Sequence, residues 1–153
     1  MRYREPHFSA AIHLIGQQIV FQLENKTTEF RIDHIQVIGE FSAPPGLLSA
    51  DYFFSFKLRG QNQLVDIPAY TEGLFDEVLP QLRRYLPGIG NPKLQMSTEL
   101  ASNVLYPAHV SGLPMYKFSS EAKPMINLPV LRKLGNIHKV VKGLNPEVLA
   151  AVY

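Results

Sequence analysis

Histidines and carboxylates lie close together in the first half of the chain, and such pairs can bind metals or transfer protons. Asp33 precedes His34 in RIDHIQ, and His13 lies in AIHLI. Both segments are typical of β-strands, in which adjacent residues point to opposite faces. The spacing of these residues also matches no metal-binding motif. We therefore expect ordinary strand histidines here and no metal site.

The carboxylates and glycines elsewhere have simpler explanations than catalysis. Glu72, Asp76 and Glu77 lie early in a predicted helix, where acidic side chains complement the helix dipole. The G-x-G in PGIGNP (87–92) precedes a proline, whereas the dinucleotide-binding motif needs a strand, the glycines and then a helix. The chain has no Cys, which excludes disulfides and thiolate chemistry. These features predict a non-catalytic protein without a cofactor.

One enzymatic alternative stays open. A site can be assembled from polar residues that are far apart in the sequence, such as His34, Asp66 and His109. A deep pocket beside one of these histidines would support that alternative.

Residues 8–70 have the pattern of a succession of β-strands. FSAAIHLI and IVFQLE are separated by the turn-like triplet Gly16-Gln17-Gln18. In EFRIDHIQVIGEFS the apolar phase slips, which indicates either two strands that meet or one long strand with a bulge, for which Gly39 is the candidate. Nine Phe and seven Tyr favour a β-rich core.

The segments YFFSFKLRG and QLVDIPA form the clearest predicted strand pair. A turn at Gln61-Asn62 would place Lys57 opposite Asp66. A turn at Gly60-Gln61 would move the register by two residues and separate these charges. Both registers keep the same face inward, so the two alternatives stay open.

An amphipathic helix is predicted over residues 71–86, with Thr71 as its N-cap. Its apolar stripe consists of Leu74, Phe75, Val78, Leu79, Leu82, Tyr85 and Leu86. Pro80 interrupts it, so either one helix is kinked there or the regular helix begins near Asp76 and Pro80 falls in its first turn. The continuous stripe favours the kinked helix.

Strands up to residue 70 followed by one amphipathic helix resemble the pleckstrin-homology-like superfold, including its bacterial members. The resemblance rests on IVFQLENKTTEFRIDHIQVIGEFS, DYFFSFKLRGQNQLVDIPAY and TEGLFDEVLPQLRRYL, and covers roughly residues 5–88. It implies a bent antiparallel sheet or partial barrel closed by a C-terminal helix, and a function in binding lipid headgroups, peptides or proteins. Lipid-binding members use basic residues around the loop that joins the first two strands. The matching loop here, Gly16-Gln17-Gln18, has no positive charge, and we count five or six strands where the complete fold has seven.

Residues 93–153 form a second predicted unit, which is loop-rich and partly helical. A helix with one apolar stripe is predicted over residues 130–143, ending at Gly143, and another is predicted to begin at Asn145-Pro146. The first of these helices carries the candidate binding residues, which are Arg132, Lys133, Lys139 and Lys142.

Charge and hydropathy narrow the classes of partner. Residues 1–90 carry eight Lys/Arg and ten Asp/Glu, whereas residues 91–153 carry seven and three. The start MRYREPHFSAAIHLIG lacks the pattern expected of a signal peptide, because Glu5 and Pro6 follow the early arginines and His13 interrupts the apolar run. No window reaches the ~18 consecutive apolar residues of a spanning helix. We therefore expect a cytoplasmic protein with a basic C-terminal part.

Together these patterns predict an α+β fold with a pleckstrin-homology-like domain at 5–88 and a basic extension at 93–153. The predicted function is a non-catalytic binding or adaptor module that mediates protein–protein contact or oligomerisation. The alternative partner is an anionic membrane surface, contacted through the helix at 130–143. The low arginine content of that helix, without interleaved aromatics, argues against nucleic acid.

Overall fold

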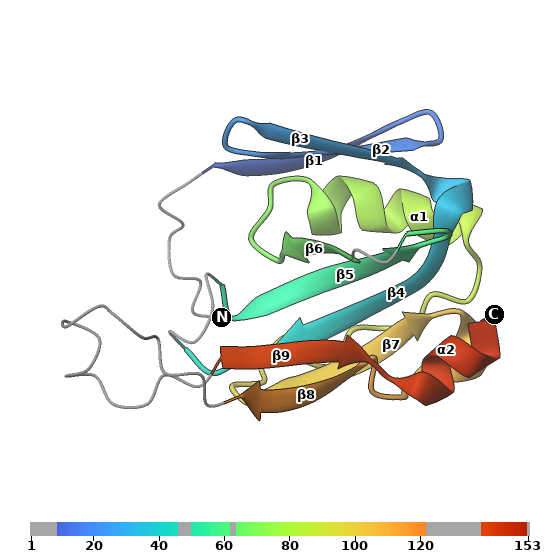
Figure 1. Ribbon diagram of the computed structural model, residues 1–153. Helices are drawn as coiled ribbons and strands as arrows, with labels where there is room; N and C mark the ends of the chain where they lie inside the picture. Colours follow the sequence, from blue (N-terminus) through green and yellow to red (C-terminus); the bar gives the residue numbers. More distant parts are fainter. Residues whose placement is uncertain (1–8, 46–49, 62–63, 122–138, 153) are drawn as a thin grey trace.

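The computed structural model describes residues 9–45, 50–61, 64–121 and 139–152. Within these residues the protein has an α+β fold with three antiparallel sheets and short helices (Figure 1). This confirms the fold class predicted from the sequence. Among the strands that the structure describes, the sheets do not close into a barrel. No helix of the described part is long and apolar enough to cross a membrane.

The strands form sheets of three, four and two members. The first sheet has the order β1-β2-β3, with β1 (Ala10–Ile15), β2 (Gln18–Leu23) and β3 (Lys26–Arg31). The second has the order β6-β5-β4-β7, with β4 (Ile35–Ser42), β5 (Tyr52–Leu58), β6 (Leu64–Pro68) and β7 (Ala101–Tyr106). The third is a hairpin of β8 (Tyr116–Glu121) and β9 (Lys139–Leu144). The helical elements are the 3₁₀ turns η1 (Ile32–His34) and η3 (Ala108–Val110), the π-helical turn η2 (Leu74–Val78), α1 (Leu79–Tyr85) and α2 (Pro146–Val152).

The phase slip in the sequence marks the junction between two strands. The 3₁₀ turn η1 separates β3 from β4 and carries the chain from the first sheet to the second. Gly39 also lies at a register shift in the pairing of β4 with β7. The sequence suggested either two strands that meet or a bulge at Gly39. The structure has both, the junction first and the irregularity at Gly39 after it.

The pairing of β5 with β6 follows the second of the two predicted registers. Phe54 faces Ile67 and Phe56 faces Val65, as expected for a turn at Gly60-Gln61. Gly60 has a φ of 72°, which suits glycine in a turn. Pro68 ends β6, which is an edge strand of its sheet, as the missing N–H predicts.

Pro80 is accommodated without a break in the helical segment. The segment begins as the π turn η2, in which the Val78 N–H donates to the Gly73 carbonyl at 2.8 Å. The α-helical part begins at Leu79, so Pro80 falls in its first turn, where the missing N–H matters little. The expected kinked α-helix is therefore wrong, and the segment is continuous because the π turn absorbs the irregularity.

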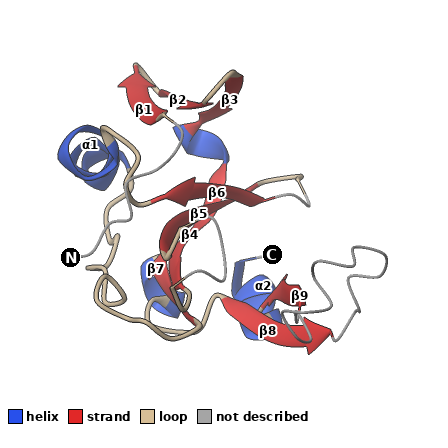
Figure 2. Ribbon diagram, turned by 90° about the vertical axis from the view of Figure 1, so that its left-hand side faces the viewer, coloured by secondary structure: helices blue, strands red, loops and turns tan. Residues whose placement is uncertain are grey.

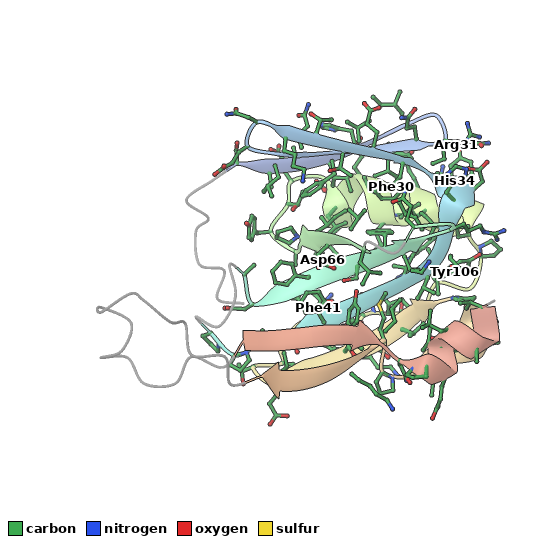
Figure 3. All side chains as sticks on the ribbon, in the orientation of Figure 1. Phe30, Arg31, His34, Phe41, Asp66 and Tyr106 are labelled. Carbon is green, nitrogen blue, oxygen red and sulfur yellow. The ribbon has the colours of Figure 1, made fainter. Side chains whose placement is uncertain are left out.

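The first hydrophobic core lies between the three-stranded sheet, one face of the four-stranded sheet and α1 (Figure 2). Strand β5 contributes Phe54 and Phe56, and α1 contributes Leu79 and Leu82. Phe30 of β3 reaches into the same core (Figure 3). The predicted apolar faces of β5 and of the helix are therefore buried against each other.

The second core lies on the opposite face of the four-stranded sheet. Phe41 and Phe53 stack there with ring centroids 4.7 Å apart, and Tyr116 packs edge-on against Phe41 at 5.7 Å. The β8–β9 hairpin and α2 cover this face, and Val148 of α2 is fully buried. Figure 2 shows the resulting order of layers, with the hairpin on the side away from β1–β3. Part of the basic extension therefore packs on the sheet, and β7 pairs directly with β4.

The predicted helix over 130–143 is wrong in its C-terminal part. Residues 139–144 form strand β9, antiparallel to β8, and residues 130–138 lie outside the described residues. The apolar spacing suits a helix, but Val140 and Val141 are β-branched and favour a strand. Pairing with β8 decides between the two conformations. The following helix does start at Asn145-Pro146, where the Asn145 Oδ1 accepts from the Glu147 N–H at 3.2 Å.

Candidate functional site

His34 is an exposed histidine of η1, and its acidic neighbour is already paired. Its Nε2 lies 4.0 Å from Asp33 Oδ1. The Asp33 carboxylate accepts hydrogen bonds from Arg31 Nε at 2.9 Å and Nη2 at 3.0 Å. The hydrogen bond from Arg31 lowers the pKa of Asp33. Asp33 is therefore held in an ion pair and does not form a proton-transfer couple with His34.

The scattered residues of the enzymatic alternative have separate surroundings. The His109 Nε2 lies 3.2 Å from the Ala151 carbonyl oxygen at the end of α2. Asp66 accepts a hydrogen bond from Ser55 Oγ at 2.5 Å. Figure 3 shows Asp66 on β6 and His34 apart from it, on the turn η1 before β4. The fold therefore does not assemble these residues into one site.

A different histidine has a carboxylate partner that the sequence analysis missed. The His13 Nδ1 on β1 lies 3.4 Å from Glu77 Oε2 on η2, and both side chains are about half exposed. These residues are far apart in the chain, so local spacing carried no signal. Within the described residues, no group of three His, Asp or Glu side chains could hold a metal ion.

Glu40 on β4 is the fully buried carboxylate that links three parts of the chain. It accepts hydrogen bonds from Tyr52 Oη at 3.1 Å, from Asn103 Nδ2 at 3.2 Å, and from the backbone N–H groups of Lys93 and Leu94 at 3.0 and 2.5 Å. All of these partners donate, which suits the acceptor-only chemistry of a carboxylate. We call these four donors the Glu40 cage. Its role is to fasten the segment after α1 to the sheet, and it leaves no free acceptor for a substrate.

Ser55, Asp66 and Tyr116 form a polar cluster beneath the hairpin. Ser55 and Asp66 face each other across β5 and β6, and Tyr116 comes from β8. Burial raises the pKa of Tyr116 far above its usual value, the Asp66 charge raises it further, and a hydrogen bond with Ser55 lowers it slightly. Tyr116 therefore stays protonated at neutral pH and cannot serve as a base. The cluster joins the hairpin to the sheet.

This cluster predicts a loss of stability in alkali. Below about pH 10 Tyr116 is protonated in both the folded and the unfolded chain, so its contribution to the free energy of unfolding does not change with pH there. Above that pH the unfolded chain ionises while the native chain does not. The free energy of unfolding should therefore fall, by about 1.4 kcal/mol per pH unit from this residue. Urea unfolding of wild type and Tyr116→Phe between pH 8 and 11.5 measures the effect. A parallel decline in both proteins would contradict it.

Strand β9 of the β8–β9 hairpin has an edge that points away from β8. The Asn145 N–H donates to the Met115 carbonyl at 2.8 Å, which sets the hydrogen-bonding phase of the hairpin. In an antiparallel pair, alternate residues bond to the partner strand. Lys139, Val141 and Gly143 therefore direct their backbone groups toward β8. The backbone groups of residues 140, 142 and 144 point away from it.

The opposite edge of the hairpin is partly occupied. The Tyr116 N–H donates to Ser102 Oγ at 2.9 Å, and Ser102 Oγ donates to the Tyr116 carbonyl at 3.3 Å. Strand β8 is thus tied to β7, whereas β9 pairs only with β8 among the described residues. Figure 1 shows β9 beside β8 and followed directly by α2.

Two other strand edges, those of β1 and β7, are covered by backbone hydrogen bonds. The Ile12 N–H donates to the Glu72 carbonyl beside β1, and the Val104 N–H of β7 donates to the Leu113 carbonyl, both at 2.8 Å. Strand β6 ends at Pro68. Strand β3 pairs only with β2 among the described residues, so its outer edge is unpaired there too, although Gln18 donates to Glu29 and Arg31 donates to Asp33. We take the β9 edge as the candidate for contact with another chain, because it belongs to the smallest of the three sheets.

The predicted binding residues divide into two groups. Lys139 and Lys142 belong to β9, whereas Arg132 and Lys133 lie outside the described residues. The sequence analysis predicted a helix for this segment, whereas residues 139–144 form a strand. Its Val-Val pair was the available signal for a strand.

A scan against protein-family models and searches of curated proteins and of solved structures found no match for this chain.

Proposed function

We propose that this protein is a non-catalytic binding module that receives an extended segment of a protein partner along the outer edge of β9. The observation that carries the proposal is that β9 pairs on one side only within the described residues. Unpaired backbone groups of an edge strand are a template for another strand. Strand addition of this kind is a common mode of peptide recognition.

The size of the hairpin sheet adds support. A sheet of two strands is only marginally stable by itself, and a third strand adds a ladder of backbone hydrogen bonds. The hairpin does not detach freely, because Tyr116 is buried in the second core and Leu144 packs against it. A partner strand would thus meet an edge that is already held in an extended conformation, which lowers the entropic cost of binding.

The resemblance to the pleckstrin-homology-like superfold is compatible with this proposal, because many of its members bind peptides or proteins. The membrane alternative has less support. It depended on an amphipathic helix over 130–143, and residues 139–143 belong to a strand instead.

A proline substitution at Lys142 tests the proposal directly. The Lys142 N–H belongs to the outward set, so Lys142→Pro removes a donor to the partner without removing one to β8. Peptides selected from a random display library should perturb the NMR signals of residues 140, 142 and 144. Lys142→Pro should weaken their binding about tenfold or more, which corresponds to one or two lost contacts.

Lys142→Thr is the matched control, because it also removes the charge but keeps the N–H. The spectra of both variants report whether the hairpin remains folded. Equal affinity of the two variants, or selection of peptides that map to another surface, would contradict strand addition at β9.

A further inference from the structure

We propose that the outer edge of β3 pairs with the β3 edge of a second copy of this chain. Strand β3 lies at the edge of the first sheet and pairs only with β2 among the described residues. Figure 2 shows it as the outermost strand of that sheet, on the side away from α1. The other edge of the sheet is occupied, because β1 exchanges backbone hydrogen bonds with Glu72. This contact uses a different edge from the proposed peptide site on β9 and does not depend on it.

The backbone phase of β3 is fixed by a hydrogen bond at its end. The Ile32 N–H donates to the Gln17 carbonyl at 2.9 Å, in continuation of the register that pairs β2 with β3. Because alternate residues of an antiparallel strand bond to one partner, Phe30 also directs its backbone groups toward β2. The backbone groups of Glu29 and Arg31 therefore point outward, where another strand can reach them.

The side chains of Glu29 and Arg31 are exposed and lie on the same face of the sheet. Arg31 donates to Asp33 through Nε and Nη2, which leaves Nη1 for another acceptor. Glu29 accepts from the Gln18 amide through Oε2 at 3.0 Å, and its Oε1 can accept from a new donor. An anion and a cation therefore lie two residues apart along an unpaired strand edge.

The charges on this edge are complementary to themselves in one register. In an antiparallel pair centred on Phe30, a two-fold axis sets Glu29 of each copy opposite Arg31 of the other, and each such pair exchanges backbone hydrogen bonds. The charges then alternate in sign around a square, with like charges only on its diagonals. Centring the pair on Glu29 or on Arg31 instead sets like charges opposite each other, which is unfavourable. The Phe30 ring faces the core, where it packs against Phe56, so it leaves the outer face to the charged pairs.

The overlap of the two strands is short, because η1 begins at Ile32, directly after β3. Small interfaces are weak, so we expect a dissociation constant on the order of 0.1 to 1 mM. Sedimentation of the full chain between about 0.02 and 2 mM should therefore show the mass rising from one chain towards two. Over the same range the NMR amide signals of Glu29 and Arg31 should shift, whereas those of Thr28 and Phe30, which face β2, should change less. A single chain at all of these concentrations would overturn the proposal.

Two charge variants distinguish this register from any other contact between copies. Glu29→Arg makes every charge of the square positive, and Arg31→Glu makes every charge negative, so each variant alone should dimerise about tenfold more weakly or less. An equal mixture of the two variants should form heterodimers, because each cross-strand pair is again opposite in charge. The double variant, Glu29→Arg with Arg31→Glu, restores the alternation and should dimerise more tightly than either single variant.

Glu72→Arg is the matched control, because it reverses a charge beside the opposite edge of the same sheet and should leave dimerisation unchanged. Thermal unfolding of each variant checks that the chain remains folded. A dimer that persists in both single variants would place the contact elsewhere and overturn the proposal. A mixture that stays monomeric while the wild type dimerises would overturn it as well.

Discussion

Glu40→Gln should destabilise the protein by about 2 to 4 kcal/mol, although the substitution changes almost no volume. The Glu40 cage consists of donors only, from Tyr52, Asn103 and the backbone of Lys93 and Leu94. A glutamine side chain replaces one acceptor oxygen by an NH₂ group, which faces donors and cannot bond to them. The donors left unsatisfied are buried and carry the full desolvation cost.

Urea unfolding monitored by circular dichroism measures this loss at pH 7. Glu72→Gln is the matched control, because the Glu72 side chain is exposed and only its backbone groups bond to β1. It should change the free energy of unfolding by less than about 0.5 kcal/mol. A similar small effect at Glu40 would show that the Glu40 cage does not contribute to stability as its geometry implies.

Gly73→Ala should destabilise the protein by about 2 to 5 kcal/mol, from a backbone conformation unfavourable to alanine and from a steric clash. Gly73 has a φ of 92°, and a Cβ added to it would clash with the Ile12 carbonyl oxygen. This close contact occurs where Glu72 and β1 exchange backbone hydrogen bonds at 2.8 and 3.1 Å. The added methyl group must therefore separate β1 from the start of the helical segment.

Gly112→Ala separates the two contributions. Gly112 has a φ of 93°, but a Cβ there would meet no atom within 4 Å. The Gly112→Ala variant should therefore show only the conformational part of the loss in the free energy of unfolding, about 1 to 2 kcal/mol. Thermal and urea unfolding of both variants give the difference. Equal losses would mean that the approach of Gly73 to β1 is not a packing constraint.

Much of the local structure could be predicted because its causes are local. The hairpin of β1 and β2 turns at Gly16-Gln17, and α2 begins after the Asn145 cap. The alternation on β5 correctly predicted that Phe54 and Phe56 share a buried face. Such features depend on residues within a few positions of each other, so period and turn chemistry suffice.

The wrong predictions concern segments whose conformation depends on contacts with parts of the chain that are distant in the sequence. The apolar residues around Val140 and Val141 have helical spacing, yet this segment pairs with β8 and forms a strand. The π turn before Pro80 depends on how Gly73 docks against β1. The role of Glu40 could not be predicted from the sequence, because its hydrogen-bond donors come from residues up to 63 positions away.

The sequence by itself determined the α+β class, the order of the strands up to Pro68, the amphipathic segment after it and the basic character of the C-terminal part. Only the tertiary structure decided which edges stay open. Whether a strand edge is covered depends on residues such as Ser102, Leu113 and Glu72, which reach it from other parts of the chain. The residues that cover a strand edge are distant from it in the sequence, so no local sequence pattern predicts which edges are covered. The edge of β9 that is unpaired among the described residues, on which the proposed function rests, could therefore be recognised only after the fold was known.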